Sequence, residues 1–276
     1  MVSRENKILV KEVDLGLSPY NNALKKQEKY FNIIIDQKIK NRKSTEKRKT
    51  SNFFLWGEHT PVITIGNRGN RNNLLVNEVE LKDKKIELFN TNRGGDITLH
   101  SPGQLVGYPI FDLTKHKKDL HWFLRNIEQC IINTLSNFDL TCTRDDAGTG
   151  VWVNNSKIAA IGLSASKWVT MHGFSMNINP NLNYFDNIIP CGIENKTVTS
   201  LNKLMLDDNN VLDIHTIGNI VANEFSTAFD LELDFIEIDE MEMIHTLLDL
   251  NEIDIEMINE EQTIESFNIV REVGRK

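Results

Sequence analysis

The sequence is poor in cysteine, in basic charge and in long apolar runs, and each shortage excludes a class of protein. Its three cysteines include no C-x-x-C pair, so neither a disulfide framework nor a zinc knuckle is indicated. A net charge of −8 argues against a nucleic-acid partner. No apolar run approaches the ~20 residues that span a bilayer, so no membrane association is expected. Residues 1–11 lack the apolar stretch of a signal peptide, so we expect a cytoplasmic location.

What is present is typical of a globular protein. The chain has 276 residues, of which 40% are hydrophobic and 25% charged, enough to bury a substantial core. After Asp230 the composition becomes acidic, and basic residues are absent until Arg271. This change predicts a main domain over residues 1–230 and an acidic C-terminal appendage over residues 231–276.

Hydrophobic periodicity predicts a mixture of helices and strands. Apolar residues at three- and four-residue steps indicate helices at 20–39, 119–138 and 211–229. Extended, β-favourable segments occur at 7–15, 53–56, 62–66, 86–89, 105–113 and 168–179, with a hairpin over 150–163. Because these elements do not alternate as regular βαβ units, the expected fold class is α+β.

The most informative stretch runs from Arg93 to Gln104, with the sequence RGGDITLHSPGQ. Its paired glycines allow a sharp turn and a close approach of the backbone to a ligand. We interpret the stretch as a loop that leads into the strand at 105–113 and presents backbone N–H groups and polar side chains to a small ligand. An ordinary surface turn is the alternative interpretation.

Two further motifs carry reactive side chains. Lys157 begins the apolar run KIAAIG, and Cys191 lies in a Pro-Cys-Gly turn. Cys130 falls on the apolar face of the 119–138 helix and is interpreted as a buried filler residue, while Cys142 has no evident role. Cys191 is therefore the candidate reagent.

Together with a Glu58-His59-x-Pro61-Val62-x-Thr64-x-Gly66 pattern, these motifs resemble the octanoyltransferase (lipoyl(octanoyl) transferase) family over most of residues 8–229. The resemblance implies a mixed β-sheet with flanking helices, like the catalytic domain of biotin and lipoate protein ligases, and an apolar acyl tunnel. It implies an octanoyl-acyl carrier protein donor. The implied acceptors are lysines of lipoyl domains, in the E2 subunits of 2-oxoacid dehydrogenases and in the glycine cleavage H protein. No cofactor is expected. No metal is expected either, because the histidines lack any spacing that brings two onto one helix face.

The resemblance also assigns site residues. Cys191 is the implied thioester nucleophile, and Lys157 the residue that lowers its pKa. The implied substrate-binding residues are Arg93, Gly94, Gly95, Asp96, Ile97, Thr98, Leu99, His100, Ala160, Ile161, Gly162, Gly173, Phe174 and Ser175.

The chemistry of these residue types suits acyl transfer. Thioester exchange needs a thiolate, and a nearby ammonium stabilises that form by about 1.4 kcal/mol for each pKa unit. The same lysine can exchange a proton with the incoming amine. For an arbitrary lysine or cysteine the alternatives are a strand-end side chain reaching into water and a small buried hydrophobe.

Three positions depart from the family pattern. Leu99 stands where the family usually has tyrosine, Ser101 replaces a glycine, and Ser164 replaces an arginine, which leaves Lys167 as the nearby cation. The last change weakens the expectation of a contact with the carrier phosphate at that spot. His59 could line the site, or it could be a turn histidine bonded to neighbouring carbonyls.

Rival functions remain open at this stage. An ATP-dependent lipoate or biotin ligase of the same fold would need no cysteine, and an amidotransferase would use a cysteine elsewhere in the chain. A non-catalytic carrier-binding protein would lack turnover. A cysteine hydrolase is disfavoured because His59, His100 and His172 form no recognisable Cys/His/Asn signature.

Overall fold

The computed structural model describes residues 7–46, 48–145, 148–190, 196–205 and 212–235. The described elements belong to one compact unit, residues 1–236. No helix in this part of the chain is long and apolar enough to cross a membrane.

The larger of two sheets has nine strands within the described residues. In order of pairing they are β12 (Leu231–Phe235), β1 (Ile8–Ser18), β2 (Phe53–His59), β6 (Gln104–Ile110), β10 (Val169–Asn177), β9 (Ser156–Ser166), β8 (Gly148–Val153) and β7 (Thr143–Asp145), while β11 (Thr197–Val198) also pairs with β9. Strand β1 is parallel to both its neighbours, β11 is parallel to β9, and the remaining pairs are antiparallel. The sheet is mixed, as the α+β prediction requires.

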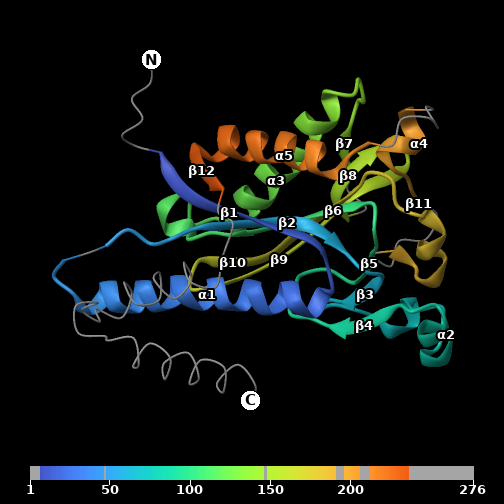
Figure 1. The fold of residues 1–276 in the computed structure, drawn as a ribbon, viewed down its shortest axis with the longest axis horizontal. Coiled ribbons are helices and arrows are strands. Elements are labelled where there is room, and N and C mark those ends of the chain that lie inside the picture. Colours follow the sequence, from blue (N-terminus) through green and yellow to red (C-terminus); the bar gives the residue numbers. More distant parts are fainter. Residues whose placement is uncertain (1–6, 47, 146–147, 191–195, 206–211, 236–276) are drawn as a thin grey trace, which may run out of the picture. The chain divides into compact units, whose positions relative to one another are not determined.

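Helices cover both faces of this sheet (Figure 1). Helix α1 (Tyr20–Lys43) lies on one face, and α3 (Leu120–Ser136) and α5 (Ile214–Phe229) lie together on the other. The side chains of Asp119 and Asp213 cap α3 and α5 by accepting backbone N–H bonds, as the polar-to-apolar change at each start favours. The main core fills the space between these two helices and the sheet, for example through the stacked rings of Phe54 and Phe225, 4.8 Å apart.

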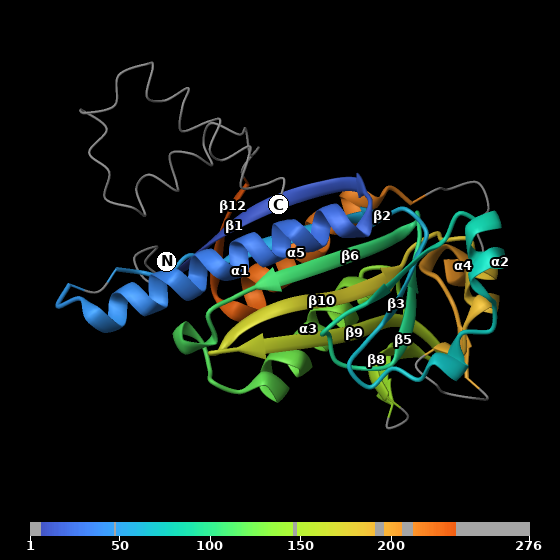
Figure 2. The same cartoon turned by 90° about the horizontal axis from the view of Figure 1, so that it is seen from below.

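A second sheet of three strands lies on the same side as α1, beside β9 and β10 (Figure 2). Its strands are β4 (Glu87–Asn90), β3 (Val62–Ile65) and β5 (Ile97–His100), and the short helix α2 (Glu78–Asp83) follows β3 in the chain. The remaining short elements are the 3-10 turns η2 (Arg71–Asn73), η3 (Leu113–Lys115) and η4 (Leu182–Asn187) and the helix α4 (Leu201–Met205). This sheet packs on its own small core.

Most of the expected elements are present, with shifted ends. The helices at 20–39 and 119–138 are confirmed, and the hairpin at 150–163 is formed by β8 and β9. The expectation of a loop before residue 105 is wrong for residues 97–100, which form β5 by pairing with β3. A four-residue strand gives little periodic signal, so its identity depends on a partner far away in the sequence.

The predicted boundary at residue 230 stays a prediction, because residues 236–276 lie outside the described part. Residues Leu231–Phe235, which the sequence assigns to the appendage, form β12 and pair with β1 in the large sheet. The unit that carries the site described below therefore reaches at least to Phe235.

Candidate functional site

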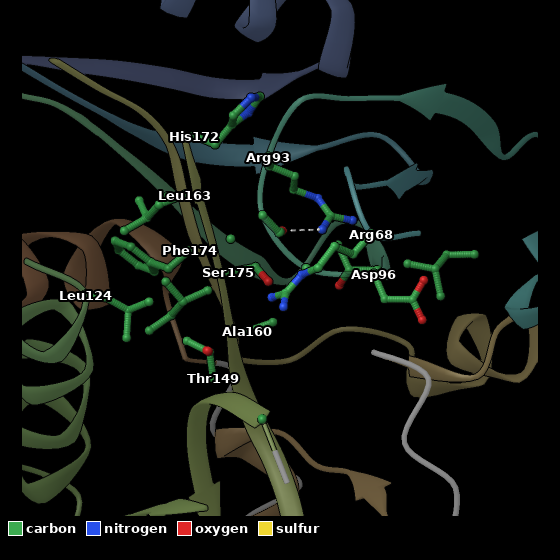
Figure 3. A pocket seen from close by; sticks show the side chains of 18 of the residues that line it. Arg68, Arg93, Asp96, Leu124, Thr149, Ala160, Leu163, His172, Phe174 and Ser175 are labelled. Atoms are coloured by element: carbon green, nitrogen blue, oxygen red, sulfur yellow. Dashed lines mark hydrogen bonds between the residues drawn. The ribbon is translucent and has the colours of Figure 1, made fainter. Parts of the chain in front are cut away.

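A cavity of about 790 Å³ is lined by the turn at residues 93–96 and strand β5 on one side, and by β9 and β10 on the other (Figure 3). Loops and helices close it. The lining residues are Tyr20, Arg68, Asn70, Asn73, Arg93, Gly94, Gly95, Asp96, Ile97, Thr98, His100, Tyr108, Leu120, Leu124, Gly148, Thr149, Lys157, Ala160, Ile161, Gly162, Leu163, His172, Gly173, Phe174 and Ser175.

Two of the sequence motifs meet as cross-strand neighbours in the wall of the cavity. Antiparallel pairing places Ala160 opposite Ser175, Ile161 opposite Phe174, and Gly162 opposite Gly173. Residues 160–162 and 173–175 therefore form one continuous patch of sheet, although ten residues separate them along the chain.

Glycines let two backbone segments, the 93–96 turn and strand β6, approach this patch closely. The N–H of Gly94 donates to the carbonyl of Leu163 at 2.8 Å, and a Cβ on Gly162 would lie 2.8 Å from the carbonyl oxygen of Gly94. A Cβ on Gly173 would lie 1.9 Å from the carbonyl oxygen of Gly107 on β6. Side chains at these two positions would force the segments apart, so the glycines set the spacing of the wall.

Arg93 stabilises the same wall from within. It is 8% exposed, and its guanidinium donates to the hydroxyl of Thr64 at 2.9 and 3.0 Å and to the Thr64 carbonyl at 2.6 Å. A further bond of 3.0 Å reaches the carbonyl of Gly94. These contacts tie the 93–96 turn to β3, so Arg93 shapes the cavity through its neighbours.

Asp96 holds a second loop over the cavity. Its carboxylate accepts a 2.7 Å bond from the backbone N–H of Asn70 and another bond from the side-chain amide of Asn73. The sequence indicates a Gly/Asn-rich loop over residues 67–73 that is suited to covering a pocket. In the structure this loop carries the lining residues Arg68, Asn70 and Asn73.

Lys157 is a buried lining residue of the cavity. It is 6% exposed, and its ammonium lies 5.1 Å from the centroid of the Trp152 ring on the adjacent strand. A Cβ on Gly150 would come within 2.6 Å of the Lys157 Cε atom, so this glycine provides the room for the side chain.

A second cation lies beside the same ring. The ammonium of Lys196 also lies 5.1 Å from the Trp152 ring centroid, and it forms a 2.7 Å ion pair with Asp145. The aromatic face attracts both charges.

Cys191 lies outside the described residues. The chain on either side of it is fixed to elements of the site: the N–H of Ile189 donates to the carbonyl of Asn73 at 2.8 Å, and Val198 pairs with Lys157.

The other two cysteines are described and are not among the lining residues. Cys130 is buried in the main core, as expected, and burial raises its pKa strongly. Burial also raises the pKa of the Cys142 thiol, to about 11. Neither is a ready thiolate at neutral pH.

Burial keeps the histidines of this region neutral. It lowers the pKa of His172 to about 4 and holds the pKa of His100 well below its usual range, and nearby His59 and Arg93 add to the effect at His100. His59 is not a lining residue: its ring bonds the Ser18 carbonyl at 2.8 Å and the Tyr108 hydroxyl at 2.6 Å. The tied-histidine interpretation is the one observed.

Among the implied substrate-binding residues, all but Leu99 line the cavity. Leu99 is fully buried in the core of the small sheet, because alternate residues of β5 face opposite sides. Its departure from the family pattern therefore does not reach the cavity wall. Ser164 and Lys167 do not line the cavity either, and Ser101 fits its turn with its N–H bonded to the Gln104 side chain at 2.8 Å.

Several further lining residues were not assigned to the site from the sequence. They come from helix starts, loops and strand ends: Tyr20, Arg68, Asn70, Asn73, Tyr108, Leu120, Leu124, Gly148, Thr149, Leu163 and His172. The partial signals were the Gly/Asn-rich loop and the apolar face of the 119–138 helix. Within the described ranges, no group of three or more His, Cys, Asp or Glu side chains could hold a metal ion.

The cavity has two chemically different ends (Figure 3). Leu124, Leu163 and Phe174 form an apolar end, to which Leu120 belongs as the residue one turn earlier in α3. Arg68 and Asp96 form a polar end, together with Asn70 and Asn73, which bond to the Asp96 carboxylate. An elongated ligand with an apolar tail and a polar head would match this division.

Known proteins resemble the chain in sequence and in fold. The model of the lipoyl protein ligase A/B catalytic domain matches residues 28–226. An octanoyltransferase of Christiangramia forsetii is 44% identical over 233 residues, which are 82% of this chain and 99% of the relative. An octanoyltransferase of Flavobacterium psychrophilum is 48% identical over 68% of this chain and 84% of its own length.

Solved structures agree on the fold. A putative lipoate protein ligase from T. acidophilum, Ta0514, superposes with a TM-score of 0.58 at 16% identity, over 87% of this chain and 94% of that one. A lipoate-protein ligase A bound with ATP gives the same TM-score at 17% identity, with the same coverage of each chain. The predicted mixed sheet with flanking helices is thereby confirmed as the lipoate ligase fold. The sequence matches go further than the fold, and on their length and identity the chain belongs to the lipoyl protein ligase A/B catalytic-domain family and, within it, to the octanoyltransferases.

Proposed function

We propose that this protein transfers an octanoyl group from octanoyl-acyl carrier protein to a lysine of lipoyl domains, through a thioester on Cys191. The observation that carries the proposal is the cavity itself, which is lined by an apolar end, a buried lysine and the 93–96, 160–162 and 173–175 segments. Burying an apolar chain contributes about 0.8 kcal/mol for each methylene, so an eight-carbon acyl group gains several kcal/mol there.

The assignment of Cys191 is supported by its neighbours and by elimination. Flanking residues Ile189 and Val198 are hydrogen-bonded or paired to Asn73 and Lys157, both of which line the cavity. The other two cysteines have raised pKa values and lie away from it. Lys157 pairs with Val198 in strand register and lines the cavity, which suits its ammonium to stabilise a thiolate there.

The reaction balances with these two groups. In the first half, the Cys191 thiolate attacks the carrier thioester, a new C–S bond forms, and the departing carrier thiolate takes a proton from the Lys157 ammonium. In the second half, the neutral amine of the acceptor lysine attacks the acyl-enzyme. The C–N bond forms, the C–S bond breaks, and the amine proton passes to Lys157, which restores the starting ammonium and thiolate.

Intact-mass spectrometry after incubation with octanoyl carrier protein tests the proposal. We expect one octanoyl adduct, lost in Cys191→Ala and retained in the matched variants Cys130→Ala and Cys142→Ala. An adduct that survives Cys191→Ala contradicts the assignment. Transfer from free octanoate and ATP, without carrier protein, would instead support the ligase alternative.

The acceptors are part of the same proposal. Lipoyl domains of 2-oxoacid dehydrogenase E2 subunits and the glycine cleavage H protein are the candidates, and a cytoplasmic location suits them. The acyl-enzyme isolated in the first assay should lose its octanoyl group to a purified lipoyl domain. It should keep the group when the target lysine of that domain is replaced by arginine.

A further inference from the structure

The cavity is positively charged although the chain as a whole is acidic. Its charged lining residues, within the described part of the chain, are Arg68, Arg93, Lys157 and the single carboxylate Asp96. The histidines that line it, His100 and His172, are neutral at pH 7 because burial lowers their pKa values. A net charge of −8 for the whole chain makes this local excess of cations a specific feature of the site.

The three cations have different tasks. Arg93 is engaged with Thr64 and the Gly94 carbonyl, and Lys157 lies over Trp152. Among the described residues, the structure gives the side chain of Arg68 neither a hydrogen bond nor an ion pair. The one carboxylate among the lining residues, that of Asp96, already accepts bonds from Asn70 and Asn73.

The backbone that carries Arg68 is held firmly. Its N–H donates to the Gly95 carbonyl at 3.2 Å, while the N–H of the preceding Asn67 donates to the Arg93 carbonyl at 2.9 Å. The side chain extends from this strap into the cavity, toward Ala160 and Ser175 (Figure 3). The guanidinium is thus presented to the cavity interior from a fixed base, although the residue is exposed to solvent.

The division of the cavity into an apolar and a polar end indicates which part of the substrate Arg68 would contact. Leu120, Leu124 and Phe174 offer the acyl chain an apolar end, and the buried Lys157 marks the reacting thioester. Arg68 is exposed, so the cavity reaches solvent on its side, and we place the rest of the proposed donor there. A pantetheine-type donor arm carries an anionic phosphoryl group at the end remote from its thioester.

We propose that Arg68 is the residue that recognises the phosphoryl group of the acyl donor, binding it through the guanidinium at the polar end of the cavity. This inference rests on the proposed function and adds a specificity-determining residue to it.

Two donors that differ in one group test the proposal. Octanoyl-4′-phosphopantetheine and octanoyl-pantetheine share the thioester and the arm, and only the first carries the phosphate. We expect the wild-type protein to be acylated with a kcat/KM roughly 10- to 100-fold higher for the phosphorylated donor, the range of a charge-assisted hydrogen-bonded pair. Arg68→Gln should reduce this preference to less than about 3-fold, and mainly by slowing the phosphorylated donor.

Matched variants separate recognition from folding. Arg71→Gln, an exposed arginine of the same loop that does not line the cavity, should keep the preference. Arg68→Lys keeps the positive charge but lacks the planar, paired N–H donors of a guanidinium, so this variant should retain part of the preference for the phosphorylated donor. An equal loss for both donors in Arg68→Gln, or a wild type that does not distinguish them, overturns the proposal.

Other outcomes are equally decisive. A defect confined to transfer onto the lipoyl domain would assign Arg68 to the acceptor and also overturn the proposal. Failure of the proposed function looks different, since no acyl adduct would then form even with intact octanoyl carrier protein.

Discussion

The two ends of the cavity are built in different ways. At the apolar end, the side chains of Leu120, Leu124, Leu163 and Phe174 from a helix and two strands create a slot whose lining is generic hydrocarbon. At the polar end, backbone bonds do the work: the 66–70 and 93–96 segments are strapped together through bonds such as Gly66 N–H to the Asp96 carbonyl, 3.0 Å. The first end can be reshaped by ordinary substitutions, whereas the second depends on glycines and fixed hydrogen bonds.

Because of this contrast, we expect the two ends to read different parts of the substrate: the apolar end its chain length and the polar end its head group. Hydrophobic burial scales with area and has no direction, so the apolar end measures chain length. Hydrogen bonds need fixed geometry, so the polar end can tell one head group from another. Lys157 belongs to neither end: it is a buried lining residue whose ammonium lies over the Trp152 ring.

The largest expected effect comes from removing Lys157, which belongs to neither end. Lys157→Ala should slow octanoyl transfer at least about 100-fold, because both half-reactions lose their proton-exchanging group. Single-turnover mass spectrometry of the two half-reactions is the measurement. Lys157→Arg keeps the positive charge that stabilises thiolates, and the departing carrier thiolate can take its proton from water. An arginine cannot accept the amine proton of the second half-reaction, so acylation should survive better than transfer. Lys167→Ala, at an exposed turn away from the cavity, is the control. Equal activity of Lys157→Ala and wild type would remove Lys157 from the mechanism.

The next largest effect is the pH dependence of folding stability caused by His172, a buried histidine that lines the cavity. His172 is neutral in the folded protein because burial lowers its pKa to about 4, whereas an unfolded histidine titrates near 6.5. Between these values the unfolded chain binds more protons, so stability is complete above about pH 6.5 and falls as the pH drops toward 4.

Urea unfolding between pH 7 and pH 4.5 measures this loss, to which His172 should contribute of order 2 kcal/mol. The variant His172→Asn tolerates the local φ of +61° and should flatten the pH dependence. His121→Asn, on the exposed side of α3, should leave it unchanged. An identical pH profile in His172→Asn would show that this ring is not the acid-sensitive group.

A third prediction reshapes the apolar end. Leu124→Phe adds volume to the slot and should exclude about two methylenes of the acyl chain. Each methylene is worth about 0.8 kcal/mol, so kcat/KM for an octanoyl donor should fall roughly 15-fold while that for a butanoyl donor changes little. Leu124→Met, which conserves volume, serves as the control. A uniform loss over all chain lengths would mean that Leu124 does not limit the acyl chain.

The smallest expected effect is the coupling between the ends. If chain length and head group are read separately, the effects of Leu124→Phe and Arg68→Gln on kcat/KM should multiply to within about 2-fold in the double variant. Kinetics of the two single variants and the double variant with octanoyl-4′-phosphopantetheine give this coupling. A strongly non-additive result would show that the two ends share one contact network, against the comparison drawn above.

The amino-acid sequence by itself determined a large part of this protein. Periodicity located the helices at 20–39 and 119–138, and motif identity located the family and, with it, the segments 93–100, 160–162 and 173–175. These features are local, because a helix is specified by residues three and four apart and a glycine turn by the residues within it.

Only the tertiary structure decided which residues, distant in the sequence, lie next to one another. Pairing between distant segments decides the formation of strand β5 and the burial of Leu99 in the core of the small sheet. It also decides the hydrogen bonds from Arg93 to Thr64 and the contact of Lys157 with the Trp152 ring. Arg68 shows this most clearly, because the sequence indicates only a Gly/Asn-rich loop and does not single out its arginine as a cavity residue. It enters the cavity because backbone hydrogen bonds hold its loop against the 93–96 turn.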